Sequence, residues 1–131
     1  MKTICILLVF ISLITSCNFN SDINGTWMIN NDYYKATYRI YDEDNCKKAL
    51  IVSYNDGTTK FSSKTKPNQY VFSNLKEQNG VYIDAISGAT KTTAPTHTNH
   101  IKIKHKDTLE VTSYIMNKPL IEFWIKSTIN N

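Results

Sequence analysis

The chain has 131 residues, with 15 basic and 11 acidic residues that give a net charge of +4. This length suits one small domain. Arg39 is the only arginine, and because specific recognition of phosphates and bases depends on arginine, the composition argues against nucleic-acid binding.

A short basic start precedes an apolar run at the N-terminus. Lys2 is followed by residues 4–14, which are apolar except for Ser12. A membrane-spanning helix needs about 20 apolar residues, and this run is shorter and ends in small, polar residues, as a cleaved signal peptide does. The motif Ile14-Thr15-Ser16-Cys17 resembles the cleavage box of bacterial lipoproteins.

The lipoprotein resemblance implies a signal peptide at residues 1–16, a lipid on Cys17, a tether at residues 17–23 and a domain at residues 24–131. Two or more acyl chains anchor a protein stably, because each buried methylene contributes about 0.8 kcal/mol. The resemblance also implies a place in the bacterial cell envelope outside the cytoplasm, with the outer membrane favoured. An ordinary secretory signal followed by a chance cysteine is the alternative.

The cysteine pattern leaves no disulfide in the mature lipoprotein. Cys5 leaves with the signal peptide and Cys17 becomes a thioether, so Cys46 has no cysteine to pair with. Cys46 follows the acidic residues 42–44, which disfavour a reactive thiolate. We therefore expect Cys46 to be unreactive and partly buried.

Beyond residue 23, β-branched and aromatic residues alternate with polar ones, and no stretch has a helical period. Turn signals such as Asn55-Asp56-Gly57, Gln78-Asn79-Gly80 and Asn117-Lys118-Pro119 separate the segments. The pattern predicts an all-β antiparallel meander of about eight or nine short strands. Exposed sheet edges would be unfavourable, so we expect a closed or partly closed β-barrel, with a strongly bent β-sandwich as the alternative. The expected strands follow an opening segment at 23–27 and cover residues 35–41, 49–54, 58–62, 70–75, 81–86, 101–104, 108–116 and 120–127.

The tripeptide Gly25-Thr26-Trp27 opens the expected barrel. Glycine allows a sharp turn against a neighbouring strand, and tryptophan supplies a large apolar plug. This resembles the Gly-x-Trp motif of the lipocalin and lipocalin-like families, in which the tryptophan on the first strand closes one end of an up-and-down barrel. An arginine near the end of the barrel often packs over that tryptophan in the family, and here Trp124-Ile125-Lys126 offers a lysine.

An eight-stranded barrel can enclose one small apolar ligand. The favoured function is therefore a non-catalytic, membrane-anchored, lipocalin-like lipoprotein that binds such a ligand or an envelope protein partner. The alternative is a barrel filled by ordinary core side chains, with a structural or accessory role in an envelope complex. The residues expected to line a cavity are Tyr38, Ile40, Val52, Tyr54, Phe72, Tyr82, Val111, Ile115 and Phe123.

A second motif indicates a different class of function. The sequence from Asp84 through Ser87, Gly88 and Ala89 to Thr90 resembles the flavinylation motif of FMN-binding domains in exported redox proteins. In that family the last threonine of the motif carries FMN through a phosphoester bond, so the resemblance implies Thr90 as the acceptor in an extracytosolic flavin carrier. The alternative is a glycine-containing loop between two strands.

Other residues give no metal or catalytic site. His97, His100 and His105 are close in sequence, but the odd separation of the last two places them on opposite faces of one strand, which disfavours a shared metal site. Residues 42–45 are rich in oxygen ligands but lack the glycine and distal glutamate of a calcium loop. We therefore expect a solvated turn there, and the favoured function requires neither a cofactor nor a catalytic residue.

Overall fold

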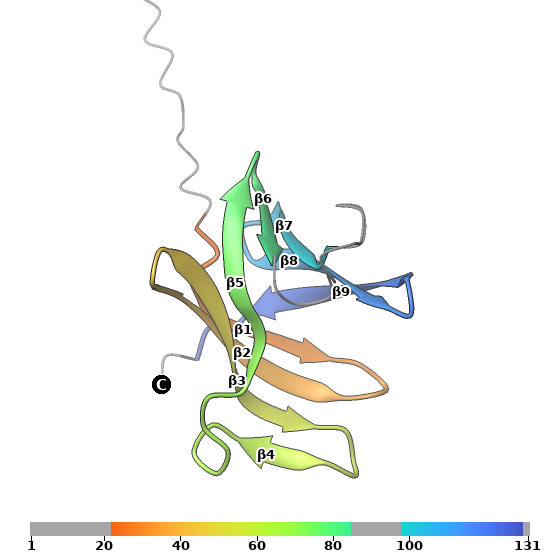
Figure 1. Cartoon of the computed structure of the whole chain (residues 1–131). Helices are drawn as coiled ribbons and strands as arrows, with labels where there is room; N and C mark the ends of the chain where they lie inside the picture. The colour runs from red at the N-terminus through yellow and green to blue at the C-terminus, as the bar shows by residue number, and fades with distance from the viewer. Residues whose placement is uncertain (1–21, 85–97, 130–131) are drawn as a thin grey trace, which may run out of the picture.

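The computed structural model describes residues 22–84 and 98–129, which form nine strands and no helix (Figure 1). None of these residues belongs to a helix long and apolar enough to span a bilayer. The strands are β1 (Gly25–Asn30), β2 (Lys35–Glu43), β3 (Cys46–Asn55), β4 (Lys60–Ser62), β5 (Tyr70–Gln78), β6 (Val81–Asp84), β7 (His100–His105), β8 (Thr108–Ile115) and β9 (Lys118–Lys126).

The strands form one antiparallel sheet that closes on itself. Their order is β2-β1-β9-β8-β7-β6-β5-β3-β4, and an additional pairing between β2 and β3 completes a ring of eight strands. The short strand β4 pairs with the second half of β3 and lies beside the ring. Neighbours in the ring follow one another in the sequence once β4 is skipped, as in an up-and-down barrel. The predicted antiparallel β-barrel is therefore confirmed.

Four two-residue turns connect strands of the ring, and three of them have both residues at positive φ. Residues 44–45, 79–80 and 116–117 all have positive φ angles between 51° and 79°, and such turns match the right-handed twist of the flanking strands. The last turn differs from the prediction of residues 117–119, because Lys118 and Pro119 already belong to β9. Pro119 is compatible with that position because this part of β9 pairs with β8 alone, and proline is confined to edge positions of sheets.

Alternation along the strands places one face of each inside the barrel. Trp27 lies opposite Tyr38 across β1 and β2, and the Tyr38 ring stacks on Trp124 with centroids 4.1 Å apart. Phe72 approaches the same tryptophan at 5.9 Å. These rings fill the middle of the barrel. The other buried apolar side chains are Ile23, Ile29, Ala36, Ile40, Ala49, Leu75, Tyr82, Ile101, Leu109 and Val111.

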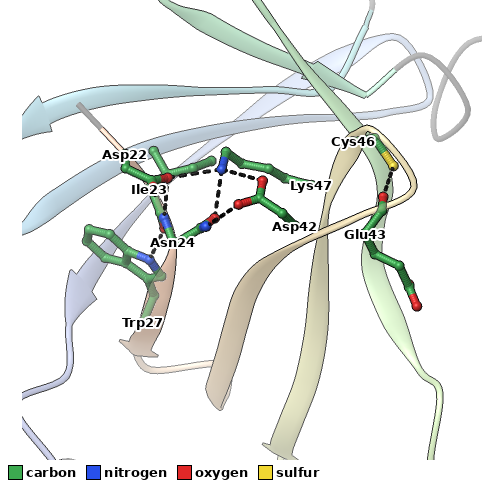
Figure 2. A network of polar contacts seen from close by, with 8 residues as sticks. All are labelled: Asp22, Ile23, Asn24, Trp27, Asp42, Glu43, Cys46 and Lys47. Carbon is green, nitrogen blue, oxygen red and sulfur yellow. Dashed lines mark hydrogen bonds and ion pairs between the residues drawn. The ribbon is translucent and has the colours of Figure 1, made fainter. Parts of the chain in front are cut away.

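The Gly-x-Trp segment packs against the chain before β1 and against Lys126. The indole nitrogen of Trp27 donates to the carbonyl of Ile23 at 2.8 Å (Figure 2), and the Lys126 ammonium lies 5.5 Å from the centroid of the Trp27 ring. Gly25 has a φ of 134°, and a Cβ at this position would meet Cε of Lys126 at 3.5 Å. Lys126 thus takes the place expected for a cation above this tryptophan.

A polar network fastens the chain before β1 to the β2–β3 hairpin (Figure 2). Lys47 pairs with Asp42 at 2.7 Å and with Asp22 at 3.0 Å, and it donates to Oδ1 of Asn24 at 2.8 Å. Nδ2 of Asn24 in turn donates to Asp42 at 2.6 Å. The hydrogen bonds from Lys47 and then Asn24 lower the pKa of Asp42. The segment before β1 is therefore held to the barrel by both apolar and charged contacts.

Candidate functional site

The first and last strands of the ring are joined by a short seam. β1 and β9 pair at Trp27 with Lys126 and at Met28 with Ile125, whereas β9 pairs with β8 along its whole length. Beyond Met28 the two strands diverge, and the tips of the β1–β2 and β8–β9 hairpins lie apart (Figure 1). The barrel wall is therefore open beside this seam.

A cleft of about 760 Å³ occupies the opening between β1 and β9. Residues 28–34 line one side, and residues 120–123 with Ile125 line the other. Pockets for small ligands have volumes of roughly 300–1,000 Å³. We name this feature the β1–β9 cleft and treat it as the candidate functional site, because it combines such a volume with inward-facing polar groups.

A hydrogen bond between distant residues lies in the wall of the β1–β9 cleft. The hydroxyl of Tyr34 donates to Oε1 of Glu122 at 2.6 Å, and both side chains are half-buried. The loop before β2 sets the position of Tyr34, because Oδ1 of Asn31 accepts from the backbone amides of Tyr33 and Tyr34 at 2.9 Å each. The cleft thus has a polar group whose place is fixed by its own hairpin.

Aromatic rings support Tyr34 from β3 and β4. Tyr34 stacks on Tyr54 with centroids 5.5 Å apart, and Tyr54 stacks on Phe61 at the same separation. Aromatic pairs at such distances contribute about 0.5–1.5 kcal/mol beyond the area they bury. β4 therefore extends an aromatic row that begins at the cleft, which gives this short strand a structural role.

Tyr34 and Tyr38 have raised pKa values. Burial raises the pKa of Tyr34, and the hydrogen bond to Glu122 raises it further. Burial likewise raises the pKa of Tyr38 to about 12. Tyr34 therefore acts as a hydrogen-bond donor to Glu122.

The outer face of β9 is apolar. Ile121, Phe123 and Ile125 are 55%, 49% and 49% exposed, and Met28 on the neighbouring strand is 38% exposed. Trp124 and Glu122 occupy the inner face, and a period of two residues then places the residues between them outside. Phe123 therefore differs from the expectation that it lines the interior, although it lines the β1–β9 cleft from the rim.

The other predicted ligand-lining residues divide into groups. Ile115 lies at the end of β8, near the tip of its hairpin, and is 58% exposed, so it does not line the interior either. Val52 and Tyr54 are half-buried, and Tyr54 is brought to the site through its contact with Tyr34. The remainder belong to the packed core, namely Tyr38, Ile40, Phe72, Tyr82 and Val111.

Tyr34 and Glu122 were missed by the sequence prediction. They are 88 positions apart, and neither belongs to a local motif. Their meeting depends on the register between β8 and β9 and on the divergence of β9 from β1. The sequence offered two signals for this pair. Tyr34 lies beside the expected strand at 35–41, and Glu122 lies within an apolar strand. Tyrosine and glutamate are both common on exposed sheet faces, so neither signal was distinctive.

A second hollow of about 620 Å³ crosses strands β1–β4. Its lining contains Lys35 and Lys60 and no acidic residue, together with hydroxyl and amide side chains such as Ser53 and Asn55. The lining of the β1–β9 cleft contains Asp32 and Glu122 and no lysine, arginine or histidine. The two hollows therefore have opposite charge preferences.

The structure describes one residue of the flavinylation-like motif. Asp84 is fully buried at the end of β6, and its Oδ2 accepts from the backbone amide of Ser73 at 3.1 Å. Residues 87–90 lie outside the described residues, as does the predicted lipidation site Cys17. FMN attachment at Thr90 and lipidation of Cys17 therefore stay predictions.

The remaining candidate groups have local partners. The Cys46 thiol is half-buried and donates to the carbonyl of Glu43 at 3.1 Å (Figure 2). Nδ1 of His100 donates to the carbonyl of Thr98 at 2.9 Å. Within residues 22–84 and 98–129, no three His, Cys, Asp or Glu side chains come together in a way that could hold a metal ion.

The structure places Gly25 and Trp27 on β1 of an up-and-down barrel, with the Lys126 ammonium near the Trp27 ring. No protein-family model matches the chain, and no curated protein or solved structure matches it significantly. The lipocalin resemblance of the sequence therefore stays a prediction.

Proposed function

We propose that the chain is a non-catalytic, membrane-anchored lipoprotein with a lipocalin-like barrel that binds a small, largely apolar ligand. The observation that carries this proposal is the β1–β9 cleft of about 760 Å³ beside the short seam of an otherwise closed barrel. The middle of the barrel is packed, so a ligand would bind in this cleft at the barrel wall.

The cleft has the composition of a binding site. Apolar side chains of Met28, Ile121 and Phe123 form its rim, and the Tyr34–Glu122 hydrogen bond provides one fixed polar point. Ligand pockets usually combine an apolar lining with a few such polar groups that orient the ligand. A role in binding is favoured over acid–base catalysis because the raised pKa of Tyr34 keeps its hydroxyl protonated near neutral pH.

The proposed anchor leaves the cleft accessible. The tether reaches the barrel at Ile23, where Trp27 and Lys47 fasten the closed end. β1 then runs from Gly25 to Asn30, so the hairpin that lines the cleft lies at the end of β1 away from the lipid. A lipidated protein would therefore sit on the membrane with its binding cleft free.

Uptake of the neutral fluorescent probe N-phenyl-1-naphthylamine by the mature protein tests the ligand-binding proposal. We expect saturable enhancement of fluorescence, with an affinity that falls severalfold in the double variant Ile121→Ser/Phe123→Ser. Ile129→Ser is the matched control, because Ile129 is 63% exposed and lies outside the cleft lining. Absence of saturable uptake, or equal loss in the control, would contradict the proposal.

Intact mass of the membrane-extracted protein tests the anchor separately. A chain starting at Cys17 with an added diacylglyceryl mass is expected, and Cys17→Ser should release the protein from the membrane fraction. An unmodified chain that begins at a different residue would instead indicate ordinary secretion.

A further inference from the structure

The charge of the β1–β9 cleft is opposite to that of the chain as a whole. The protein carries a net charge of +4, yet the two ionisable side chains of the cleft, other than tyrosines, are the acids Asp32 and Glu122. The hollow over β1–β4 shows that lysines are available to neighbouring surfaces of the same barrel. The acidic lining is therefore a local property of the cleft.

Glu122 has no cationic partner among the described residues. The ion pairs there join Lys47 to Asp22 and Asp42, Lys48 to Glu43 and Lys104 to Glu110. Glu122 instead accepts one hydrogen bond from Tyr34 at Oε1. A half-buried carboxylate with a single neutral donor retains a strong preference for a positive charge nearby.

Three aromatic side chains line the β1–β9 cleft, and one of them, Tyr34, contacts the Glu122 carboxylate directly. Tyr33, Tyr34 and Phe123 all contribute to the lining. The faces of such rings attract cations, and sites for alkylammonium ligands combine them with carboxylates. The apolar rim of Ile121 and Met28 suits a hydrocarbon body attached to the cation.

We propose that the β1–β9 cleft binds an organic cation, an alkyl- or arylammonium ion whose charged group lies against both the Glu122 carboxylate and the ring of Tyr34. This inference rests on the proposed function because it assigns the chemical class of ligand to the same cleft. A fatty acid or another organic anion would face two carboxylates and no base. A neutral hydrocarbon would occupy the rim but leave the charge of Glu122 uncompensated.

Two isosteric probes isolate the role of charge. Benzyltrimethylammonium and neopentylbenzene have nearly the same shape and differ by the replacement of nitrogen with carbon. Ligand-observed NMR titration of the mature protein gives the affinity for each probe. We expect the cation to bind at least about tenfold more tightly than the neutral isostere, because a hydrogen-bonded or charged partner in a partly buried site has an effect of this order.

Glu122→Gln tests the residue that carries the inference. Glutamine keeps the shape of the side chain and can still accept from Tyr34, so the fold should be retained. We expect the affinity for benzyltrimethylammonium to fall about tenfold and that for neopentylbenzene to stay unchanged. Glu77→Gln is the matched control, because Glu77 is exposed on β5 and lies outside the cleft lining.

The possible results separate this inference from the function on which it rests. If Glu122→Gln weakens cation binding and Glu77→Gln does not, the result supports both the cation assignment and the ligand-binding function. Equal affinities for the two probes, with no effect of Glu122→Gln, would overturn the cation assignment and leave an apolar binding site. If Glu77→Gln lowers the affinity for the cation as much as Glu122→Gln does, the effect comes from the overall charge of the protein, and the cation assignment is overturned. Failure of both probes and of N-phenyl-1-naphthylamine to bind would overturn the binding function itself.

Discussion

Lys126 and Trp27 face each other across the seam between β9 and β1, with the ammonium 5.5 Å from the centroid of the indole ring. The same lysine stem passes beside Gly25, where a side chain would come within 3.5 Å of it. The lysine therefore covers the tryptophan that closes the barrel. Its aliphatic stem and its charge both contribute to that cover.

Removal of this cover should weaken the fold modestly. Lys126→Ala is expected to lower the free energy of unfolding by about 0.5–1 kcal/mol, the usual contribution of an exposed cation–π contact. Lys126→Arg should retain the stability, because guanidinium groups also stack on indole rings. Urea denaturation monitored by tryptophan fluorescence measures both variants. If Lys126→Arg lowers the free energy of unfolding as much as Lys126→Ala does, the result would contradict a stabilising role of the cation.

The two tryptophans should differ in their tolerance of phenylalanine. The indole nitrogen of Trp27 donates to the carbonyl of Ile23 at 2.8 Å, whereas that of Trp124 has no acceptor in the described parts of the chain. Both variants lose similar ring volume, but only Trp27→Phe leaves a buried carbonyl without its donor. We expect Trp27→Phe to cost about 1–2 kcal/mol more than Trp124→Phe, as measured by thermal unfolding followed by circular dichroism.

The contacts of Asp42 should make stability dependent on acidic pH. Hydrogen bonds from Lys47 and Asn24 lower the pKa of Asp42 below its usual value of 3.8. A depressed pKa contributes stability that is present above the usual value and is lost as the pH falls through the folded value. Asp42→Asn should therefore be less stable at neutral pH and lose less stability between neutral pH and pH values below 3.8.

Asp107→Asn is the control for this experiment, because Asp107 lies in the β7–β8 turn without an ion pair among the described residues. Its melting temperature should follow the wild-type profile with pH. A wild-type profile for Asp42→Asn as well would show that the network around Lys47 does not contribute to acid sensitivity.

Two phenylalanines test which face of β9 is inside. Phe72 is 1% exposed and Phe123 is 49% exposed. Phe72→Ala is expected to cost about 3–5 kcal/mol, as usual for a core phenylalanine, and Phe123→Ala should cost less than about 1 kcal/mol. Chemical denaturation of both variants provides the measurement. A large decrease in the free energy of unfolding of Phe123→Ala would indicate that the opposite face of β9 points into the barrel.

The flavinylation prediction has a direct mass test. Co-expression with a flavin transferase should add the mass of FMN to the peptide that contains Thr90 if the motif is functional, and Thr90→Ala should abolish the addition. An unmodified wild-type chain under conditions that load a known acceptor domain would leave residues 87–90 as an ordinary loop. This result is independent of binding in the β1–β9 cleft.

Local patterns in the sequence were sufficient for the strands and the barrel. Alternation located β2, β3 and β8 to within a few residues. The face of β9 could not be predicted in the same way, because Trp124 on one face and Phe123 on the other are both strongly apolar. Packing of Trp124 against Tyr38 decides between them, and that contact depends on the closed ring.

The β1–β9 cleft could not be predicted from local sequence patterns for a related reason. Its inner hydrogen bond joins Tyr34 to Glu122 across most of the chain. Its width depends on how far β1 and β9 remain paired, which is set by strand stagger around the whole barrel. No short segment contains that information, whereas each two-residue turn is specified by its own residues.

The seam between β1 and β9 also determines when the ring can form. Trp27 and Lys126 come from the first and last strands, so this contact has almost the greatest sequence separation that the barrel contains, and contacts of this kind form late and slowly. During synthesis from the N-terminus, the contact between Trp27 and Lys126 cannot form until β9, the last strand, has been made.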